Sequence, residues 1–172
     1  MDIQTFPGFL TAEQCADWRE RIRTIEAANF TDTGKFTNKK WEDLDLATAF
    51  HTRLVELDPS TRYKRANNLI MAGLYKPGDS FGLHTDTGLY YNRVAGEESR
   101  WTLLIYLNTV QEGGETVFYS TEGWKEVLRI KPEEGKALLF DIDLWHCGEP
   151  IVEGEKLWIG CEIIGEIVPI VP

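Results

Sequence analysis

The feature that most constrains the fold is a series of short apolar segments that fills the chain after residue 66. Glycine and proline separate these segments, most clearly at Pro77-Gly78, Gly113-Gly114, Gly123, Gly135 and Gly154. Residues 101–107 and 137–140 are almost continuously apolar, as strands buried on both faces are. The pattern predicts strands over about 67–75, 80–86, 101–108, 115–119, 125–131, 136–141, 145–150 and 156–166.

Two helices are expected before these strands. Thr11 and Gln14 have the spacing of a capping box, and apolar residues then follow at helical spacing, which predicts a helix over about 11–28. A second apolar face predicts a helix over about 43–57, which stops before Pro59. The polar segment 31–40 is predicted to be a loop, and residues 6–10 to be a short strand or entry turn.

Helices followed by about eight strands indicate an α+β fold. The expected form is a double-stranded β-helix, a jelly roll or cupin-like barrel, braced by N-terminal helices. At 172 residues the chain is expected to form a single domain, residues 1–172. Helical support is predicted over about 11–58 and the β-barrel core over about 66–166.

Composition narrows the expected partners and location. The net charge of −10, from 18 basic and 28 acidic residues, weighs against a nucleic-acid substrate, because phosphate binding needs a basic face. Cys15, Cys147 and Cys161 lack metal-type spacing and are expected to be reduced thiols of a cytoplasmic protein. The sequence has neither a signal-peptide pattern nor an apolar run as long as a membrane span, so no membrane partner is expected.

A possible metal centre comes from three residues. His84 and Asp86 are two positions apart, so in an extended strand their side chains point to the same face. With His146 they make two imidazoles and one carboxylate, a set that holds Fe(II) and leaves coordination positions open. On spacing alone, a core histidine plus an unrelated surface pair is an equally good interpretation. His51, on the predicted second helix, is expected to be surface or core filler.

Several short segments, in a fixed order, carry a resemblance to a known family. They are Tyr75, nine residues before His84; Phe81 with His84-Thr85-Asp86; Leu-Ile-Tyr-Leu-Asn at 104–108; Gly-Gly-Glu-Thr-Val-Phe at 113–118; Gly-Lys-Ala-Leu-Leu-Phe at 135–140; and His146 followed by Pro150, Gly154 and Lys156. Region 67–166 thereby resembles the 2-oxoglutarate- and Fe(II)-dependent dioxygenase superfamily, in its prolyl 4-hydroxylase-like branch. Residues 8–14 also look like the opening of that family.

The resemblance implies roles for particular residues. His84, Asp86 and His146 are the implied iron ligands, and Lys156 is the implied partner of the distal carboxylate of 2-oxoglutarate. Tyr75 and Thr116 match positions whose hydroxyls bind the same co-substrate. The implied cofactors are Fe(II), 2-oxoglutarate and O₂, with ascorbate as a reductant. Taken alone, Lys156 suits a solvated turn, and Tyr75 and Thr116 suit ordinary strand positions.

The chain departs from the prolyl 4-hydroxylase pattern where the substrate is bound. The family has a tryptophan sixteen residues after the last iron histidine, and this chain has Glu162 there. The family's substrate-contacting arginine has only a near match in Arg100. Candidate substrate contacts are therefore Arg100, Tyr90, Tyr91 and Arg93. All four belong to the segment 87–100, which is predicted to be a long loop, either a lid or an ordinary connection.

These patterns support one main hypothesis and two alternatives. The main hypothesis is an Fe(II)- and 2-oxoglutarate-dependent hydroxylase of an unactivated C–H bond, acting on a prolyl or other peptidyl side chain. A free amino acid or small metabolite is the alternative substrate. A non-catalytic cupin-like module that binds metal or ligand is the alternative from another class. The sequence gives no oligomeric state.

Overall fold

The computed structural model describes residues 2–26, 34–122 and 124–167. Two helices, α1 (Ala12–Thr24) and α2 (Leu44–Leu57), lie in its first third. The strands are β1 (Ile3–Phe6), β2 (Gly34–Lys35), β3 (Thr37–Glu42), β4 (Arg65–Ala66), β5 (Leu69–Tyr75), β6 (Ser80–His84), β7 (Tyr91–Asn92), β8 (Glu97–Tyr106), β9 (Glu112–Gly113), β10 (Thr116–Tyr119), β11 (Glu126–Ile130), β12 (Ala137–Asp141), β13 (His146–Gly148), β14 (Ile151–Glu153) and β15 (Lys156–Glu166). Each of the predicted strand segments after residue 66 contains one of these strands, except that 101–108 overlaps β8, which begins four residues earlier at Glu97.

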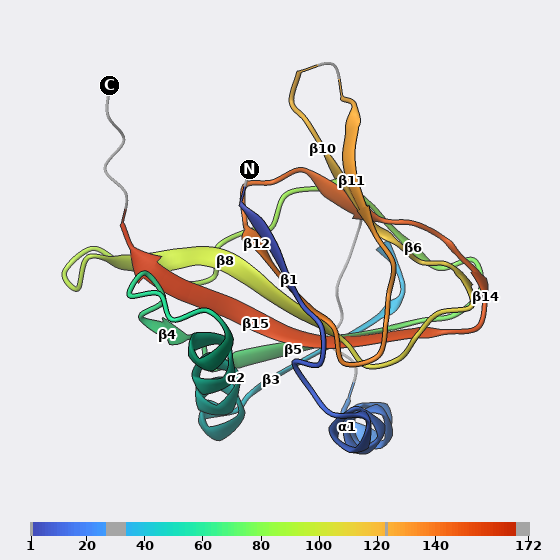
Figure 1. Cartoon of the computed structure of the whole chain (residues 1–172), viewed down its shortest axis with the longest axis horizontal. Coiled ribbons are helices and arrows are strands. Elements are labelled where there is room, and N and C mark those ends of the chain that lie inside the picture. Colours follow the sequence, from blue (N-terminus) through green and yellow to red (C-terminus); the bar gives the residue numbers. More distant parts are fainter. Residues whose placement is uncertain (1, 27–33, 123, 168–172) are drawn as a thin grey trace.

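The strands form two sheets that face each other, and a small third one. The major sheet has the order β1-β12-β8-β15-β5-β3, with β4 paired to β15 and β7 to β8. The minor sheet has the order β11-β10-β13-β6-β2, and β14 pairs with β9. Figure 1 shows both helices on one side of the major sheet and β6, β10 and β11 of the minor sheet on the other. Sheet-on-sheet packing with bracing helices is the predicted architecture.

The helices begin where the sequence predicted. Thr11 and Gln14 form the expected capping box, with hydrogen bonds of 2.9 and 3.2 Å between each side chain and the other's backbone N–H. Asp43 caps α2 by accepting a hydrogen bond from the backbone N–H of Leu46 at 2.9 Å. Neither α1 nor α2 is long and apolar enough to cross a membrane, so the described ranges contain no such helix.

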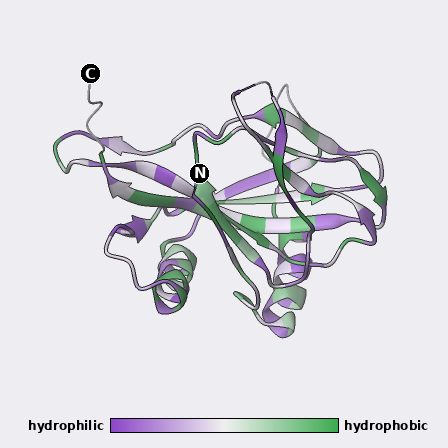
Figure 2. Cartoon of the chain, turned by 45° about the horizontal axis from the view of Figure 1, so that its top comes forward, coloured by the Kyte–Doolittle hydropathy of each residue, from purple (hydrophilic) through white to green (hydrophobic). Residues whose placement is uncertain are grey.

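Strand β15 shows how the major sheet serves two layers. Successive side chains of a strand point to opposite faces. Leu157, Ile159, Cys161 and Ile163 are fully buried in the core between this sheet and the helices. The alternating residues Lys156, Trp158 and Glu162 line a cavity between the two sheets. Figure 2 shows strongly hydrophobic stretches along strands in the middle of the molecule, in keeping with these cores.

The predicted loop 31–40 is wrong over most of its length. Residues 34–35 and 37–40 belong to β2 and β3, while 31–33 lie outside the described residues. Strand β3 pairs with β5 along its full length, from Thr37 opposite Leu74 to Glu42 opposite Leu69. Backbone pairing at the sheet edge therefore overrides the polar composition of the segment. The buried ammonium of Lys39 donates hydrogen bonds to two backbone carbonyls of the α1 end, which compensates its burial.

Two other segments differ from prediction, and one alternative holds. Helix α1 ends at Thr24; residues 25–26 are not helical, and 27–28 lie outside the described residues. The first strand is Ile3–Phe6 and residues 7–10 form a turn, as the entry-turn alternative for 6–10 predicted. The segment 87–100 is not one loop, because β7 pairs with the start of β8 from Tyr91 opposite Glu98. Its turn is held by Asn92, whose side chain accepts hydrogen bonds from two backbone N–H groups at 3.0 and 3.1 Å.

Candidate metal centre and co-substrate cavity

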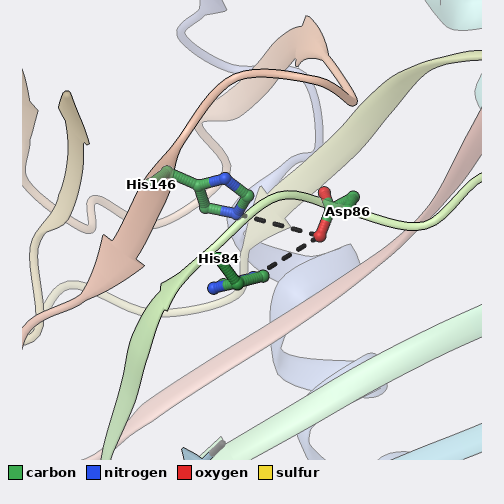
Figure 3. Close-up of side chains that lie close together, drawn as sticks. All are labelled: His84, Asp86 and His146. Carbon is green, nitrogen blue, oxygen red and sulfur yellow. Dashed lines mark ion pairs between the residues drawn. The ribbon is translucent and has the colours of Figure 1, made fainter. Parts of the chain in front are cut away.

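Two neighbouring strands of the minor sheet bring the candidate metal ligands together. His84 ends β6, and His146 begins β13 directly opposite it in the strand pairing. Asp86 follows β6, where its backbone N–H donates a hydrogen bond to the carbonyl of Ile142 at 2.9 Å. Its Oδ1 lies 3.5 Å from Nε2 of His84 and 3.8 Å from Nε2 of His146 (Figure 3). The structure thus places all three predicted ligands at one point.

The Nδ1 atom of each histidine ring is within hydrogen-bonding distance of a backbone carbonyl oxygen. Nδ1 of His84 is 2.7 Å from the carbonyl oxygen of Gly82, and Nδ1 of His146 is 2.9 Å from that of Leu144. A carbonyl oxygen only accepts, so each Nδ1 carries a proton, and Nε2 is the nitrogen that offers a lone pair to a metal ion whenever the ring is neutral. Burial also lowers the pKa of His146, despite the opposing effect of Asp86. Both rings are therefore ready to bind a cation.

Asp86 is held as a carboxylate. Its Oδ2 accepts a hydrogen bond from the hydroxyl of Thr102 at 2.5 Å, and this leaves Oδ1 facing the histidines. Burial by itself raises the pKa of this carboxyl group. Hydrogen bonds from His84 and Thr102 and the charge of His146 lower the pKa by more than burial raises it, so the net shift is downward. A hydrogen bond that orients a ligating carboxylate is typical of metal sites.

The three residues fit a metal ion by their geometry. One ligand atom from each of His84, Asp86 and His146 lies within 4.8 Å of the others. Metal–nitrogen and metal–oxygen bonds of roughly 2 Å allow one ion to reach all three atoms. Two imidazoles and one carboxylate would hold such an ion and would leave it coordination positions for other ligands.

The cavity beside the triad has a volume of about 380 Å³ and lies between the two sheets. His84, Asp86, His146 and Lys156 all line it. Its apolar lining includes Phe36, Met71, Phe81, Leu104, Phe140 and Trp158. A largely apolar pocket with a few polar groups is the usual form of a small-molecule site.

Lys156 is a buried cation within this cavity. It is 3% exposed, and its ammonium donates a hydrogen bond to the carbonyl of Gly114 at 2.9 Å and lies 4.3 Å from the ring centre of Tyr75. Neither contact supplies a negative charge. Burial accordingly lowers its pKa from 10.5 to about 8, against small opposing effects of Cys147 and Glu115. An anion that entered the cavity would find here both a charge and free N–H donors.

The structure places the other two predicted co-substrate residues around Lys156. Tyr75 is its partner in the β5–β15 pairing, and Thr116 lies on the opposite sheet, in β10. Both line the cavity. The hydroxyls of Thr116 and Tyr106 are 2.6 Å apart, and both residues are buried. Burial strongly raises the pKa of Tyr75, so its hydroxyl stays protonated at neutral pH.

The four predicted substrate contacts are not brought to the cavity. Arg100 lies in β8 and forms ion pairs with Glu98 at 3.2 Å and Asp141 at 3.8 Å. Tyr91 is 65% exposed, and Tyr90 packs under the guanidinium of Arg65. Arg93 lies in the turn between β7 and β8. Among the described residues, none of the four lines the cavity around the triad.

Some site residues were missed by the sequence interpretation. Thr102, which holds Asp86, stands out only as a polar residue in an apolar strand. Lys40 and Asn38 line the cavity from β3, the segment predicted as a loop. No spacing signal marks them, because their segment is polar and has no strand-like apolar pattern. His51, as expected, takes no part: its Nε2 lies 3.0 Å from the carbonyl of Tyr63.

Comparison with known proteins identifies the family. The sequence profile of the 2OG-Fe(II) oxygenase superfamily, in which 2OG stands for 2-oxoglutarate, matches residues 70–161. The chain belongs to this superfamily. The matched region contains the His-Asp-His cluster and Lys156. The family is named for Fe(II) and 2-oxoglutarate. The cavity contains a set of metal-binding side chains and a buried cation that suits a carboxylate.

The relatives are hydroxylases with modest sequence identity. "Probable prolyl 4-hydroxylase 7" of Arabidopsis thaliana is 27% identical over 193 residues, which cover 88% of this chain and 58% of that protein. A "PKHD-type hydroxylase" of Klebsiella pneumoniae (strain 342) is 27% identical over 177 residues, which cover 89% of this chain and 76% of that protein. The chain thus spans little more than half the length of the plant relative.

Solved structures show the same fold. The viral collagen prolyl hydroxylase of Paramecium Bursaria Chlorella virus-1, in its 2OG complex, has a TM-score of 0.70 and 21% identity, and the match covers 95% of this chain and 96% of that chain. HygX of Streptomyces hygroscopicus with nickel, 2-oxoglutarate and hygromycin B has a TM-score of 0.64 and 15% identity, with 95% and 82% coverage. These likenesses confirm the predicted double-stranded β-helix.

Proposed function

We propose that the protein is an Fe(II)- and 2-oxoglutarate-dependent dioxygenase that hydroxylates an unactivated C–H bond. The observation that carries this proposal is one cavity with two polar features. His84, Asp86 and His146 converge at one point of its wall, and the buried ammonium of Lys156 lies in the same space. Bound Fe(II) with 2-oxoglutarate activates O₂ for C–H oxidation, with succinate and CO₂ as co-products.

Each protein group has a defined task in this proposal. The Nε2 atoms of His84 and His146 and Oδ1 of Asp86 bind the metal, while Thr102 keeps the carboxylate turned towards it. Lys156 binds the distal carboxylate of 2-oxoglutarate through charge-assisted hydrogen bonds. The hydroxyls of Tyr75 and Thr116 orient that carboxylate. The surrounding aromatic side chains exclude water, which strengthens these electrostatic contacts.

For the substrate we propose a prolyl or other peptidyl side chain. Support comes from the prolyl 4-hydroxylases among the relatives and solved structures. A small molecule is the second candidate, supported by the hygromycin B bound to the structural neighbour HygX. Arg100, Tyr90, Tyr91 and Arg93 stay predictions as substrate contacts, although none lines the cavity.

We further propose a single catalytic domain and a cytoplasmic location. The major sheet contributes to both cores, with Leu139 on the helix side and Leu138 on the cavity side of one strand, which supports one cooperative unit. The cysteines at 15, 147 and 161 are all free thiols, which supports a reducing compartment.

The activity is tested by succinate formation. Protein loaded anaerobically with Fe(II) and 2-oxoglutarate is exposed to O₂, and succinate is quantified without and with a proline-rich peptide, whose mass gain of one oxygen atom is measured. Wild-type protein is expected to form succinate slowly alone and faster with substrate. His146→Ala is expected to lose metal retention and succinate formation together, because a facial site with two remaining ligands binds iron weakly.

His51→Ala is the matched control. It removes the histidine that touches only a backbone carbonyl outside the cavity, so metal retention and succinate formation should stay at wild-type levels. If wild-type protein binds iron and 2-oxoglutarate but forms no succinate, the dioxygenase proposal fails and the non-catalytic binding module is supported. If it binds neither, the cavity has no such function.

A further inference from the structure

Glu162 places a buried carboxylate in the wall of the cavity at the end away from Lys156. Both residues lie on the cavity face of β15, six positions apart, which corresponds to roughly 20 Å along a strand. Glu162 is 2% exposed and pairs across the sheet with Thr102, the residue that holds Asp86. This carboxylate is therefore next to the metal centre and far from the co-substrate anchor.

The hydrogen bonds that Glu162 accepts in the described part of the chain come from neutral groups. Its Oε2 accepts hydrogen bonds from the hydroxyl of Ser99 at 2.5 Å and the amide of Asn67 at 3.3 Å. The backbone N–H of Leu89 is shared between Oε1 at 3.1 Å and Oε2 at 3.0 Å. Oε1 thus receives only a shared hydrogen bond, although a carboxylate oxygen can accept two. Spare acceptor capacity and negative charge remain on the cavity side.

Strand β3, in the same sheet as β15, adds polar groups to this wall of the cavity, and the strand pairing places Asn38 level with Trp158 and Lys40 level with Gly160. Asn38 and Lys40 line it, and the buried Oδ1 of Asn38 has no hydrogen-bond partner among the described residues. Burial lowers the pKa of the Lys40 ammonium, and the negative charge of Glu162 opposes this shift, so Lys40 and Glu162 interact electrostatically. A purely apolar substrate would offer no hydrogen-bond donor to Oε1 of Glu162 or to Oδ1 of Asn38, which is unfavourable in a buried site.

We propose that Glu162 determines substrate specificity by binding a positively charged nitrogen, an ammonium or guanidinium group, of the substrate. The inference rests on the proposed hydroxylase function and adds the chemistry of the recognised group. Oε1 accepts the hydrogen bond, and Ser99, Asn67 and Leu89 hold the carboxylate in place. The charged group can come from a free amino acid or from a basic peptide.

The test compares probes that differ only in that charge. One pair is L-proline and N-acetyl-L-proline, and the other is a proline-rich peptide with lysines and the same peptide with acetyl-lysines. Stimulated succinate formation gives KM and kcat, and the rise of Tm in metal- and 2-oxoglutarate-loaded protein without O₂ gives binding. The charged member of at least one pair is expected to have a KM lower by about tenfold or more, since charge-assisted hydrogen bonds are strong. The responding pair distinguishes the free from the peptidyl source.

Glu162→Gln separates recognition from structure. The amide keeps one oxygen to accept from Ser99 and Leu89 but removes the charge, so it should abolish the preference for the charged probe mainly through KM. Equal responses to both members of each pair, or a preference that survives in Glu162→Gln, overturn the inference. Substrate-independent succinate formation by the wild type is read in the same assay. Its absence counts against the proposed activity, whereas its presence without charge preference counts against the role of Glu162 alone.

Discussion

The helix-facing and cavity-facing sides of the major sheet bury different kinds of side chain, as strand β15 shows. On β15, the side chains that face the helices are Leu157, Ile159, Cys161 and Ile163, all fully buried. Those that face the minor sheet include Lys156 and Glu162, which are charged and nearly as buried. The comparison teaches that burial on the helix side stabilises the fold, whereas burial on the cavity side places polar groups for a ligand.

The energetic signs of the two faces are opposite. A fully buried aliphatic side chain such as Ile159 stabilises the fold by roughly 1.5–3 kcal/mol. Burial of Lys156 lowers its pKa from 10.5 to about 8, which corresponds to roughly 3 kcal/mol of destabilisation at neutral pH. Burial of Lys156 on the cavity face of the sheet thus destabilises the fold, and burial of apolar side chains on the helix face offsets this cost.

Replacement of Lys156 by methionine gives the largest expected effect. Lys156→Met should weaken 2-oxoglutarate binding by roughly 30-fold or more, because it leaves the buried carboxylate of the co-substrate without an oppositely charged partner. The same variant should raise the free energy of unfolding of the ligand-free protein, because a buried ammonium is replaced by an apolar side chain. Calorimetric titration and urea unfolding measure the two effects.

The matched control for this substitution is Lys64→Met. Lys64 pairs with Glu166 at the exposed end of the sheet, so its loss should change stability little, because exposed ion pairs contribute little, and should leave 2-oxoglutarate binding intact. If Lys156→Met lowered stability and left 2-oxoglutarate binding unchanged, Lys156 would be a structural residue and the comparison of the two faces would fail.

The pH dependence of stability has a defined sign. Between pH of about 8 and 10.5 the unfolded chain binds a proton at Lys156 that the folded, ligand-free protein does not, because the folded-state pKa is the lower one. The free energy of unfolding should therefore rise with pH across this window, relative to Lys156→Met at the same pH. Saturating 2-oxoglutarate should remove the rise, since the bound carboxylate favours the charged ammonium. Urea titrations from pH 7 to 10.5 test it; a difference that falls with pH contradicts the assignment.

On the helix side the expected result is the reverse. Ile159→Ala should lower the free energy of unfolding by roughly 2–5 kcal/mol, because it leaves a cavity in a filled core. The affinity of the remaining folded protein for 2-oxoglutarate should stay within about twofold of wild type. Val152→Ala, at a 60% exposed position, is the control and should change neither quantity appreciably. Lost affinity with little lost stability would show that the two faces are not independent.

The same contrast explains how much the sequence could predict. The apolar face of β15 and the runs 101–107 and 137–140 predict buried strands, because hydrophobic pattern is a local property. The strand β3 could not be predicted, because its polar residues pair only once β5 is beside them. Family resemblance found the triad and Lys156, and the structure brings them into one cavity. Thr102 could not be assigned to Asp86, because that contact depends on how the two sheets face each other.

The smallest expected effect comes from the cavity wall opposite Lys156. Thr116 lies on the minor sheet, and its hydroxyl is 2.6 Å from that of Tyr106 on the major sheet. Thr116→Val should weaken 2-oxoglutarate binding by roughly 10-fold, the lower end of the range for a hydrogen bond to a charged acceptor. It should also lower stability by about 1–3 kcal/mol, because the buried hydroxyl of Tyr106 loses its partner. Titration calorimetry and urea unfolding measure both.

Two further variants separate these two consequences. Thr116→Ser keeps a hydroxyl and should retain most of the affinity for 2-oxoglutarate. The double variant Thr116→Val with Tyr106→Phe removes both hydroxyls, so it should recover stability without recovering affinity. If affinity returned in the double variant, the loss in Thr116→Val would come from the unpaired Tyr106 hydroxyl and not from contact with the co-substrate. Thr116 would then have a structural role only, and 2-oxoglutarate binding would depend on Lys156, Tyr75 and the metal triad.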